Sequence, residues 1–516
     1  MYYQYEMCEL SFPVNEIQDS FAEINLYADL NDPLGHMVSA RGFYDGEGIC
    51  RIRFYPSVPG IWTWHVRGLV CADGQSEVFP ARTGHHGMVK AVGMHFEYED
   101  GMPYYPFGTT VYALAHQPDP LVEETLCTLK DNPFNKVRMC VFPKNYNYNK
   151  NEPPFYPFEK KQNGDWDVGR PCISFWKRFE HILQRLWELE IQVDLILFHP
   201  YDRWGFCRMT QADNLLYLNY LQCRLAAWPG LWWSLANEYD LNLSSRTMKE
   251  WEELEEAVAS SDPWKHLLSV HNCFQPWDYS RPNITHISLQ TKVITLLMPY
   301  RQLYQKPVIL DECCYEGNLE EFWGSISGKE MTARFWMAFA SGAWCTHGET
   351  YLDPTTEDPD NAVVWWSKGG KLIGESPKQI AFLRKITEEV GVGLEPIPDM
   401  LESIPPEKAE EMIASATPRF GGFLRGVFRM EKTYRERFLA SEHKWRAHAG
   451  NRVFIVFYDR RTCASDTLDL PETETYRIEQ IDIWKMERKT VLTGVKGKTR
   501  VILPGTEGTA LIAWKE

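Results

Sequence analysis

Residues 231–239 read Leu-Trp-Trp-Ser-Leu-Ala-Asn-Glu-Tyr, an apolar run of strand length that ends in an amide and a carboxylate. Residues 306–312 repeat this pattern as Lys-Pro-Val-Ile-Leu-Asp-Glu, with two carboxylates after the apolar run. Continuous apolar runs of this length are typical of strands buried on both faces, as in a parallel sheet. The two stretches therefore indicate an α/β protein with polar groups at the ends of buried strands.

Eight such runs occur from about residue 89 onward, separated by longer segments of helical period such as Ser174–Leu189 and Asp213–Ala227. This alternation predicts βα units. The predicted strands are Tyr105–Val111, Lys136–Phe142, Gln192–Phe198, Leu231–Ala236, Leu267–His271, His286–Leu289, Pro307–Leu310 and Ala343–His347. Eight units over roughly 300 residues favour a closed (β/α)8 TIM barrel over a doubly wound sheet.

Both ends of the chain have β character, because apolar and polar residues alternate there between turn signals. The strand-like segments are Ile24–Leu30, Arg51–Tyr55 and Ile61–Arg67 near the start, and Arg452–Tyr458, Tyr476–Trp484 and Thr499–Leu503 near the end. A chain of 516 residues also exceeds the size of one core. We predict a small β-sandwich over residues 1–85, the barrel over 89–395, and a second small β-sandwich over 410–516.

The net charge of −16 disfavours nucleic acid or an anionic membrane as a partner, since both need a basic surface. No basic leader with an apolar core begins the sequence, and no run of about 18 apolar residues follows, so we expect a cytoplasmic protein. Thirteen cysteines without a C-x-x-C pair indicate free thiols. The accessory domains are expected to buttress the barrel or to form an interface in a homo-oligomer.

Two glutamates are the candidate catalytic residues. In a TIM barrel the chemistry sits at the carboxyl ends of the strands, and Glu238 and Glu312 end the fourth and seventh predicted strands. Paired carboxylates can hydrolyse a glycosidic bond, one giving a proton to the leaving oxygen while the other attacks or stabilises the anomeric carbon. Asn237 can donate a hydrogen bond to a sugar hydroxyl. Asp311 is a rival to Glu312, but strand neighbours point to opposite faces, so only one can face the bowl.

Three histidines also follow predicted strands and can bind sugar hydroxyls or orient the nucleophile, although each can equally be satisfied within the barrel rim. They are His199, His271 and His347. No H-E-x-x-H or other clustered ligand spacing appears, so neither a metal nor another cofactor is expected. The sequence also lacks a G-x-S-x-G elbow, a P-loop and a G-x-G-x-x-G motif, which disfavours esterases, NTPases and dinucleotide-dependent enzymes.

Glu349 is a candidate third carboxylate near the sugar, with an ion pair to Arg138 or Arg203 as the alternative. Aromatic rings stack on the apolar faces of sugars, and several stand in loops after predicted strands. The stacking candidates are Trp204, Trp277, Tyr315 and Trp366. Together these residues predict a pocket for a small carbohydrate.

The segments Trp233–Tyr239 and Lys306–Gly317 resemble the clan A glycoside hydrolases, and within that clan the apiosidase-like proteins of bacteria. Phe107–Thr110 and Asn135–Met139 fit the same pattern, so the resemblance covers nearly the whole chain. It implies a barrel between an N-terminal Ig-like and a C-terminal sandwich domain. It also implies a retaining mechanism with Glu238 as acid/base and Glu312 as nucleophile, their carboxyl groups roughly 5 to 5.5 Å apart.

The hypothesis is therefore a retaining, exo-acting glycosidase for short oligosaccharides or glycosides, and the sequence does not indicate which sugar. Two alternatives remain open. One is a non-catalytic carbohydrate-binding protein on a degenerate barrel, and the other is an inverting hydrolase or transglycosylase that uses the same bowl.

Overall fold

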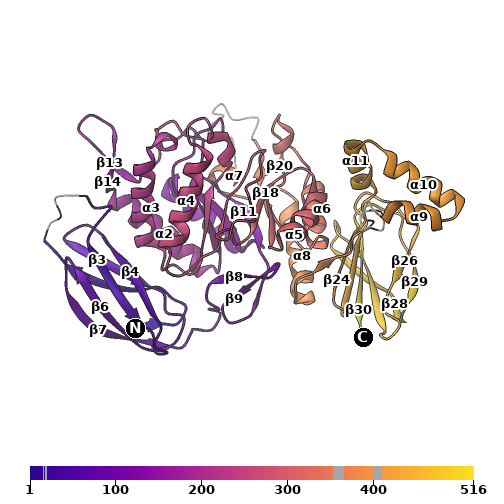
Figure 1. Cartoon of the computed structure of the whole chain (residues 1–516), viewed down its shortest axis with the longest axis horizontal. Coiled ribbons are helices and arrows are strands. Elements are labelled where there is room, and N and C mark those ends of the chain that lie inside the picture. Colours follow the sequence, from indigo (N-terminus) through magenta and orange to yellow (C-terminus); the bar gives the residue numbers. More distant parts are fainter. Residues whose placement is uncertain (16, 18–19, 353–364, 400, 402–403, 405–407) are drawn as a thin grey trace. The chain divides into compact units, whose positions relative to one another are not determined.

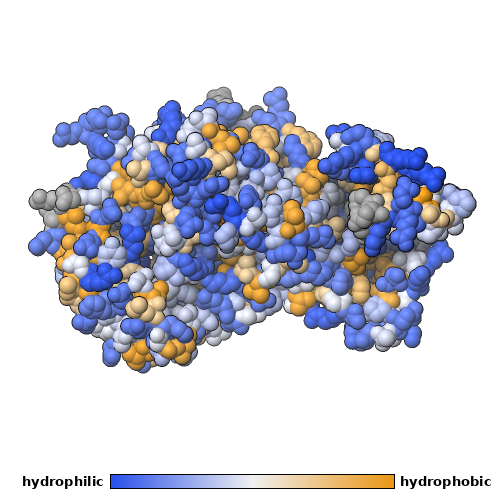
Figure 2. All heavy atoms as spheres, viewed as in Figure 1, coloured by the Kyte–Doolittle hydropathy of each residue, from blue (hydrophilic) through white to orange (hydrophobic). Residues whose placement is uncertain are grey.

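The computed structural model describes residues 1–15, 17, 20–352, 365–399, 401, 404 and 408–516 (Figure 1). These residues fall into two compact units. The first comprises residues 1–292, 303–331 and 345–378, and the second comprises residues 293–302, 332–344 and 379–516. In the described part of the chain, no helix is long and apolar enough to cross a membrane. On the face drawn in Figure 2, small apolar groups are scattered among hydrophilic residues, the usual pattern of a protein surface.

The first unit begins with a β domain. Its strands are β1 (Tyr2–Tyr3), β2 (Cys8–Pro13), β3 (Leu26–Asn31), β4 (Met37–Tyr44), β5 (Ile49–Phe54), β6 (Gly60–Gly68) and β7 (Ala72–Phe79), in the order β1-β7-β6-β3-β4-β5-β2. Along β3, Leu26, Ala28 and Leu30 are fully buried in a core that also contains Ile52 and Trp62, while the residues between them are partly exposed. The alternation of apolar and polar residues therefore correctly predicted that one face of this strand packs against the core.

Eight parallel strands follow and form the barrel. They are β11 (Phe107–Thr110), β12 (Lys136–Cys140), β15 (Gln192–Phe198), β16 (Leu231–Ala236), β17 (Leu268–Ser269), β18 (Ile287–Gln290), β19 (Val308–Glu312) and β21 (Trp344–His347). Their spatial order is β17-β16-β15-β12-β11-β21-β19-β18, and a parallel bridge between His271 and Ser288 joins the two ends. The predicted (β/α)8 TIM barrel is thus confirmed, and all eight predicted strands are present.

The helices between these strands follow the expected alternation with one exception. They are α1 (Asp119–Lys130), α2 (Ile173–Glu188), α3 (Gln211–Leu225), α4 (Met248–Ser261), α5 (Leu297–Tyr304), α6 (Gly328–Ala340), α7 (Trp365–Lys368) and α8 (Ser376–Val390). Residues 270–286, between β17 and β18, contain no helix. The short strands of the loops are β13 (Phe158–Lys160), β14 (Trp166–Pro171), β20 (Glu316–Gly317) and β22 (Glu349–Thr350).

The amino end of the barrel is covered by a small sheet of β8 (Val89–Val92), β9 (His95–Tyr98) and β10 (Pro103–Tyr104). Phe96 and Tyr104 place their rings 5.3 and 5.8 Å from that of Trp232, which is fully buried. Above this apolar plug the charged side chains of Lys136 and Asp194 meet at 2.7 Å inside the barrel. The interior is therefore packed rather than open, and the carboxyl end of the barrel is left for a site.

A buried ion network joins the β domain to the barrel helices within the first unit. Arg224 on α3 contacts Glu180 on α2 at 2.6 Å and Asp45 at 2.7 Å. Arg53 on β5 contacts the same Glu180 at 2.5 Å. Because both arginines and both carboxylates are at least nine-tenths buried, the loss of one partner would leave an uncompensated buried charge. In this structure the β domain buttresses the barrel.

The second unit ends in another β domain. Its strands are β23 (Glu395–Pro396), β24 (Trp445–Ala449), β25 (Val453–Phe457), β26 (Ser465–Asp469), β27 (Tyr476–Asp482), β28 (Glu487–Val495), β29 (Lys498–Ile502) and β30 (Thr509–Lys515). They form a six-stranded sheet, β23-β24-β25-β30-β27-β28, and the pair β26-β29. Between residues 409 and 442, where the sequence predicts β structure, lie three helices instead, α9 (Ala409–Ser415), α10 (Pro418–Arg429) and α11 (Lys432–Glu442). Ile413, Leu424 and Val427 are buried at helical spacing, the signal that was missed.

Candidate active site

A cavity of about 780 Å3 opens at the carboxyl end of the barrel strands. Glu238 reaches it from the end of β16 and Glu312 from the end of β19. The residues that line it are Tyr112, Lys144, Tyr146, Asn147, Tyr148, Tyr201, Glu238, Cys273, Phe274, Gln290, Thr291, Lys292, Glu312, Cys314, Tyr315, Glu321, Trp323 and Trp366. Two carboxylates within aromatic walls are what a sugar-cleaving site requires.

Glu238 is held by three hydrogen bonds and a constrained backbone. Its Oε2 accepts hydrogen bonds from the Tyr201 hydroxyl and from Nδ2 of Asn237 at 3.1 Å, and its Oε1 accepts one from Nε2 of Gln290 at 3.2 Å. Its φ of 50° lies in the left-handed region, directly before the 3-10 turn Tyr239–Asn242. A non-glycine residue there costs on the order of 1 kcal/mol, so the surroundings fix its orientation.

The carboxylate of Glu312 lies close to a phenol, a guanidinium and an imidazole. Its Oε1 accepts a hydrogen bond from the Tyr112 hydroxyl, while Nη1 of Arg138 lies 3.5 Å away and Nε2 of His271 lies 3.8 Å away. Burial lowers the pKa of His271 well below its ordinary value, so its imidazole is neutral. Glu312 therefore has a hydrogen-bond donor and a guanidinium that favour its ionised form.

The two carboxylates are electrostatically coupled. Burial and the nearby charge of Glu238 raise the pKa of Glu312 to about 7, while Arg138, Lys144 and the Tyr112 hydrogen bond act in the opposite direction. Two carboxylates this close disfavour being ionised together, so the charge of Glu238 makes Glu312 hold its proton more tightly than an ordinary glutamate.

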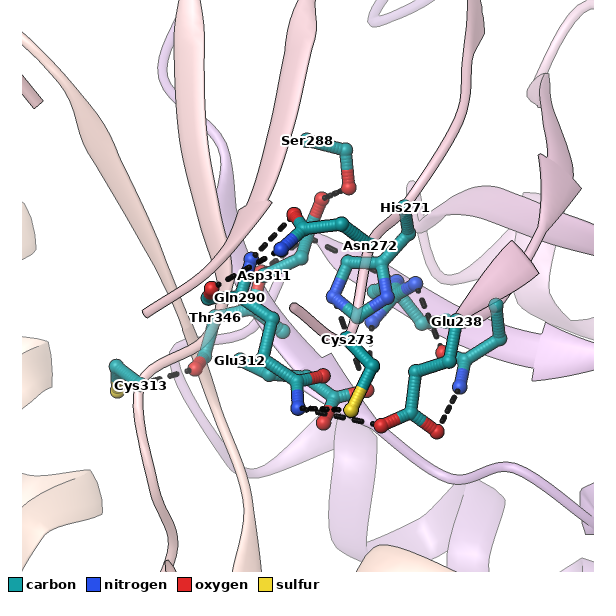
Figure 3. Close-up of polar contacts among 12 residues, drawn as sticks. Glu238, His271, Asn272, Cys273, Ser288, Gln290, Asp311, Glu312, Cys313 and Thr346 are labelled. Atoms are coloured by element: carbon teal, nitrogen blue, oxygen red, sulfur yellow. Dashed lines mark hydrogen bonds and ion pairs between the residues drawn. The ribbon is translucent and has the colours of Figure 1, made fainter. Parts of the chain in front are cut away.

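A chain of contacts connects the two acids. The Tyr112 hydroxyl, which donates to Glu312, also lies 3.1 Å from Oδ1 of Asn237, and Asn237 donates to Glu238. Arg138 holds the same Oδ1 at 3.2 Å, which fixes the orientation of the amide. In Figure 3 the carboxylates of Glu238 and Glu312 point toward the same space, beside Gln290 and Cys273. Residues far apart in the chain thus form one site.

Asp311, the rival nucleophile, lies inside the barrel and outside the cavity lining. It is fully buried, and it accepts hydrogen bonds from Lys136 at 2.8 Å, Ser288 at 2.6 Å and Thr346 at 2.8 Å. Lys136 and Arg138 hold the pKa of its carboxyl well below the ordinary range. These contacts give Asp311 a structural role and leave Glu312 as the carboxylate of β19 that reaches the cavity.

Four of the residues singled out in the sequence line the cavity, namely Glu238, Glu312, Tyr315 and Trp366. Asn237 and His271 lie directly behind this lining, fully buried, and act on the carboxylates.

Two of the aromatic candidates lie elsewhere. Trp277 is buried, donates to Glu255 at 3.1 Å and packs edge-on against Tyr239, so its faces are occupied by protein. Trp204 donates to Glu152 at 3.0 Å and is outside the lining. A position after a strand end was therefore not enough to place an aromatic ring in the pocket.

His199 and His347 are also outside the lining. Nε2 of His199 contacts the carbonyl of Phe142 at 3.1 Å, and Nδ1 of His347 contacts Oγ1 of Thr109 at 3.1 Å. Burial lowers the pKa of each to about 3, so both imidazoles are neutral. Each histidine therefore uses one ring nitrogen within the barrel rim, and neither reaches the cavity where a sugar would bind.

Glu349 is buried and outside the cavity lining, and it forms no ion pair with Arg138 or Arg203 in the described part of the chain. Its Oε1 accepts a hydrogen bond from the backbone N–H of Ile373 at 2.7 Å. Burial and the negative charge of Glu316 raise its pKa to about 7.

Several residues of the site were not predicted from the sequence. Tyr112, Tyr201 and Gln290 lie at or just after the ends of β11, β15 and β18, so the rule that found the glutamates could have found them. Lys144 and Trp323 lie farther from the ends of the barrel strands, and no local sequence pattern identifies them as site residues. The Lys144 ammonium lies 3.4 Å from the centre of the Tyr112 ring, a contact that only folding creates.

The barrel and its paired glutamates define a glycoside hydrolase of the clan A fold, and comparisons with known proteins agree. The apiosidase-like catalytic domain matches residues 91–392, and two domains of unknown function, DUF5060 and DUF5605, match residues 1–68 and 443–513. The chain belongs to the apiosidase-like family.

Solved structures support this assignment. A crystal structure described as a "putative glycoside hydrolase" from Bacteroides vulgatus ATCC 8482 is 32% identical, with a TM-score of 0.85, over 100% of this chain and 99% of that one. A glycoside hydrolase family 5 protein from the same organism is 15% identical, with a TM-score of 0.58, over 83% of this chain and 93% of that one, and shares the fold. A comparison with curated proteins finds no match.

Proposed function

We propose that this glycoside hydrolase works by a retaining double displacement, with Glu312 as nucleophile and Glu238 as acid/base. The observation that carries the proposal is that both carboxylates line one cavity and are connected through Asn237 and Tyr112.

The surroundings of each glutamate support its role. Arg138 and the Tyr112 hydroxyl stabilise negative charge on Glu312, as a nucleophile requires. Glu238 contacts neutral donors, Tyr201, Asn237 and Gln290, and has no Lys or Arg ion pair in the described part of the chain, so it can accept and release a proton more readily.

In the first step an oxygen of Glu312 attacks the anomeric carbon as the bond to the leaving oxygen breaks, and Glu238 transfers its proton to that oxygen. In the second step Glu238 removes a proton from water, whose oxygen displaces Glu312 from the anomeric carbon. The product keeps the starting configuration, because each displacement inverts the centre once.

We further propose exo-action on short oligosaccharides or glycosides. The cavity volume lies in the range of pockets that hold small ligands. Tyr146, Tyr315, Trp323 and Trp366 supply aromatic surface for sugar rings along its wall.

A panel of nitrophenyl pentosides and hexosides in both anomeric forms tests turnover and substrate together. With the best sugar of that panel, a 2-fluoro glycoside should leave a covalent adduct on Glu312, detected by peptide mass spectrometry. NMR should show a first product of retained configuration. An inverted product, or an adduct on another carboxylate, would refute the assignment, and sugar binding without turnover would support a binding protein.

Variants separate the two roles. Glu312→Gln should abolish turnover of every substrate, whereas Glu238→Gln should slow glycosides with poor leaving groups far more than nitrophenyl ones. Equal, mild losses in both variants would contradict the proposed roles.

A further inference from the structure

A second cluster of ligating side chains lies away from the cavity lining. Glu316 on β20, His347 on β21 and Glu349 on β22 each offer one ligand atom, and these atoms lie within 4.8 Å of one another. Glu316 and Glu349 are direct partners in the parallel pairing of β20 with β22. We propose that these three residues bind a divalent metal ion.

Two atoms of the cluster have unused bonding capacity. Nε2 of His347 and Oε2 of Glu349 are buried and have no hydrogen-bond partner among the described residues. The His347 ring cannot easily turn away, because its Nδ1 contacts Thr109 and its face stacks on Phe134 at 4.8 Å. Buried polar atoms in folded proteins nearly always have a partner, so two orphans in one place indicate a missing ligand.

The charge of the cluster points to a cation. Glu316 and Glu349 are 0% and 1% exposed, and within the described chain neither forms an ion pair with Lys or Arg. The donors to Glu316 are neutral, namely the backbone N–H groups of Glu375 and Ser376 and the hydroxyls of Ser376 and Tyr351. Buried charges are normally paired or bound to a metal.

The donor set selects the kind of metal. One imidazole nitrogen with two carboxylates suits Zn2+ or Mn2+ better than Ca2+, which prefers six or more oxygens. His347 would donate its Nδ1–H to Thr109 and present the Nε2 lone pair, an arrangement common in metal sites. Because Glu316 already accepts four hydrogen bonds, His347 and Glu349 are the principal ligands, and Glu316 shares an oxygen that is already hydrogen-bonded.

The ion would have a structural role. Glu349 and Glu316 also hold the segment Ile373–Ser376 that leads into α8, so a bound metal would tie this segment to the ends of three strands. The sequence contains no H-x-x-x-H-like motif that would identify this site, because the ligands come from three separate strands.

The test uses the full chain, expressed in medium supplemented with Zn2+ or Mn2+ so that an ion can enter during folding. After gel filtration, plasma mass spectrometry should find about one equivalent of metal per chain, and prolonged EDTA treatment should lower the melting temperature. Co2+ loading should give visible absorption bands of a nitrogen- and oxygen-ligated ion, a readout that needs no variant.

Glu349→Gln, which keeps the size of the side chain, should lose the bound metal and the effect of EDTA. Glu159→Gln, the same change on an exposed carboxylate of β13, should keep both. Less than 0.1 equivalent in every preparation, with no effect of EDTA, would overturn the proposal in favour of a buried water. Equal metal in wild type and Glu349→Gln would place the ion elsewhere and overturn it too.

Discussion

Replacing Glu312 with glutamine should stabilise the protein at alkaline pH and have little effect at acid pH. The side chain is only 12% exposed and lies close to Glu238, and its removal from water and that charge together raise its pKa to about 7. Glutamine keeps the shape of the side chain and carries no charge, so the variant removes the cost of ionisation in this place.

The sign follows from proton linkage. The folded protein holds this proton more tightly than the unfolded chain, so the stabilisation is complete at pH below about 4.5 and is lost as pH rises through about 7. The shift from the ordinary value of 4.5 corresponds to about 3 kcal/mol of unfolding free energy. For a domain of this size that is roughly 6 °C in melting temperature.

Melting followed by tryptophan fluorescence at pH 5 and pH 8.5 measures the effect. We expect Glu312→Gln to melt about 5 °C above the wild type at pH 8.5 and within about 2 °C of it at pH 5. Glu321→Gln is the matched control, because Glu321 lines the same cavity but is exposed and stays hydrated when ionised. The same difference at both pH values would refute the buried, coupled state of Glu312.

Three further substitutions test the site and its support. Tyr201→Phe removes a hydrogen-bond donor to the proposed acid/base, so kcat/KM for glycosides with poor leaving groups should fall by about 10- to 100-fold. Steady-state kinetics compare this loss with the loss for nitrophenyl glycosides. Arg224→Met removes one arginine from both Asp45 and Glu180, which keep Arg51 and Arg53, and should cost about 3 kcal/mol, seen as a lower melting temperature by calorimetry; an unchanged value would contradict the network. Gly348→Ala places a Cβ against the Tyr315 ring, so activity should fall at least about 10-fold while circular dichroism stays native. Gly422→Ala, whose Cβ meets nothing within 4 Å, should leave activity unchanged.

Much of the fold could be predicted because burial leaves a periodic mark on the sequence. The strands β15 and β16 have the bounds that the sequence predicts, Gln192–Phe198 and Leu231–Ala236. The apolar pattern is less distinct where a strand is short, as in β17 with two residues. The helices between residues 409 and 442 were not predicted, because strand-like segments dominate the rest of that region. Local polarity reports which face is buried, and it does not report what that face meets.

For the site, position at a strand end selected Glu238 and Glu312, both of which line the cavity. The same rule selected Trp277, which the fold buries against Tyr239, and passed over Tyr112. Whether a residue after a strand turns inward depends on loop conformation, which is set by contacts from distant segments.

The sequence by itself determined a barrel of eight strands between two β-rich ends, with polar residues where buried strands stop, because hydrophobic burial acts on each segment separately. Tertiary structure alone decided that Glu238 and Glu312 share one cavity, that Asp311 pairs with Lys136 instead, and that Glu316, His347 and Glu349 converge. Those outcomes depend on electrostatic and hydrogen-bond contacts between strands that are remote in the chain, and such contacts leave no periodic trace.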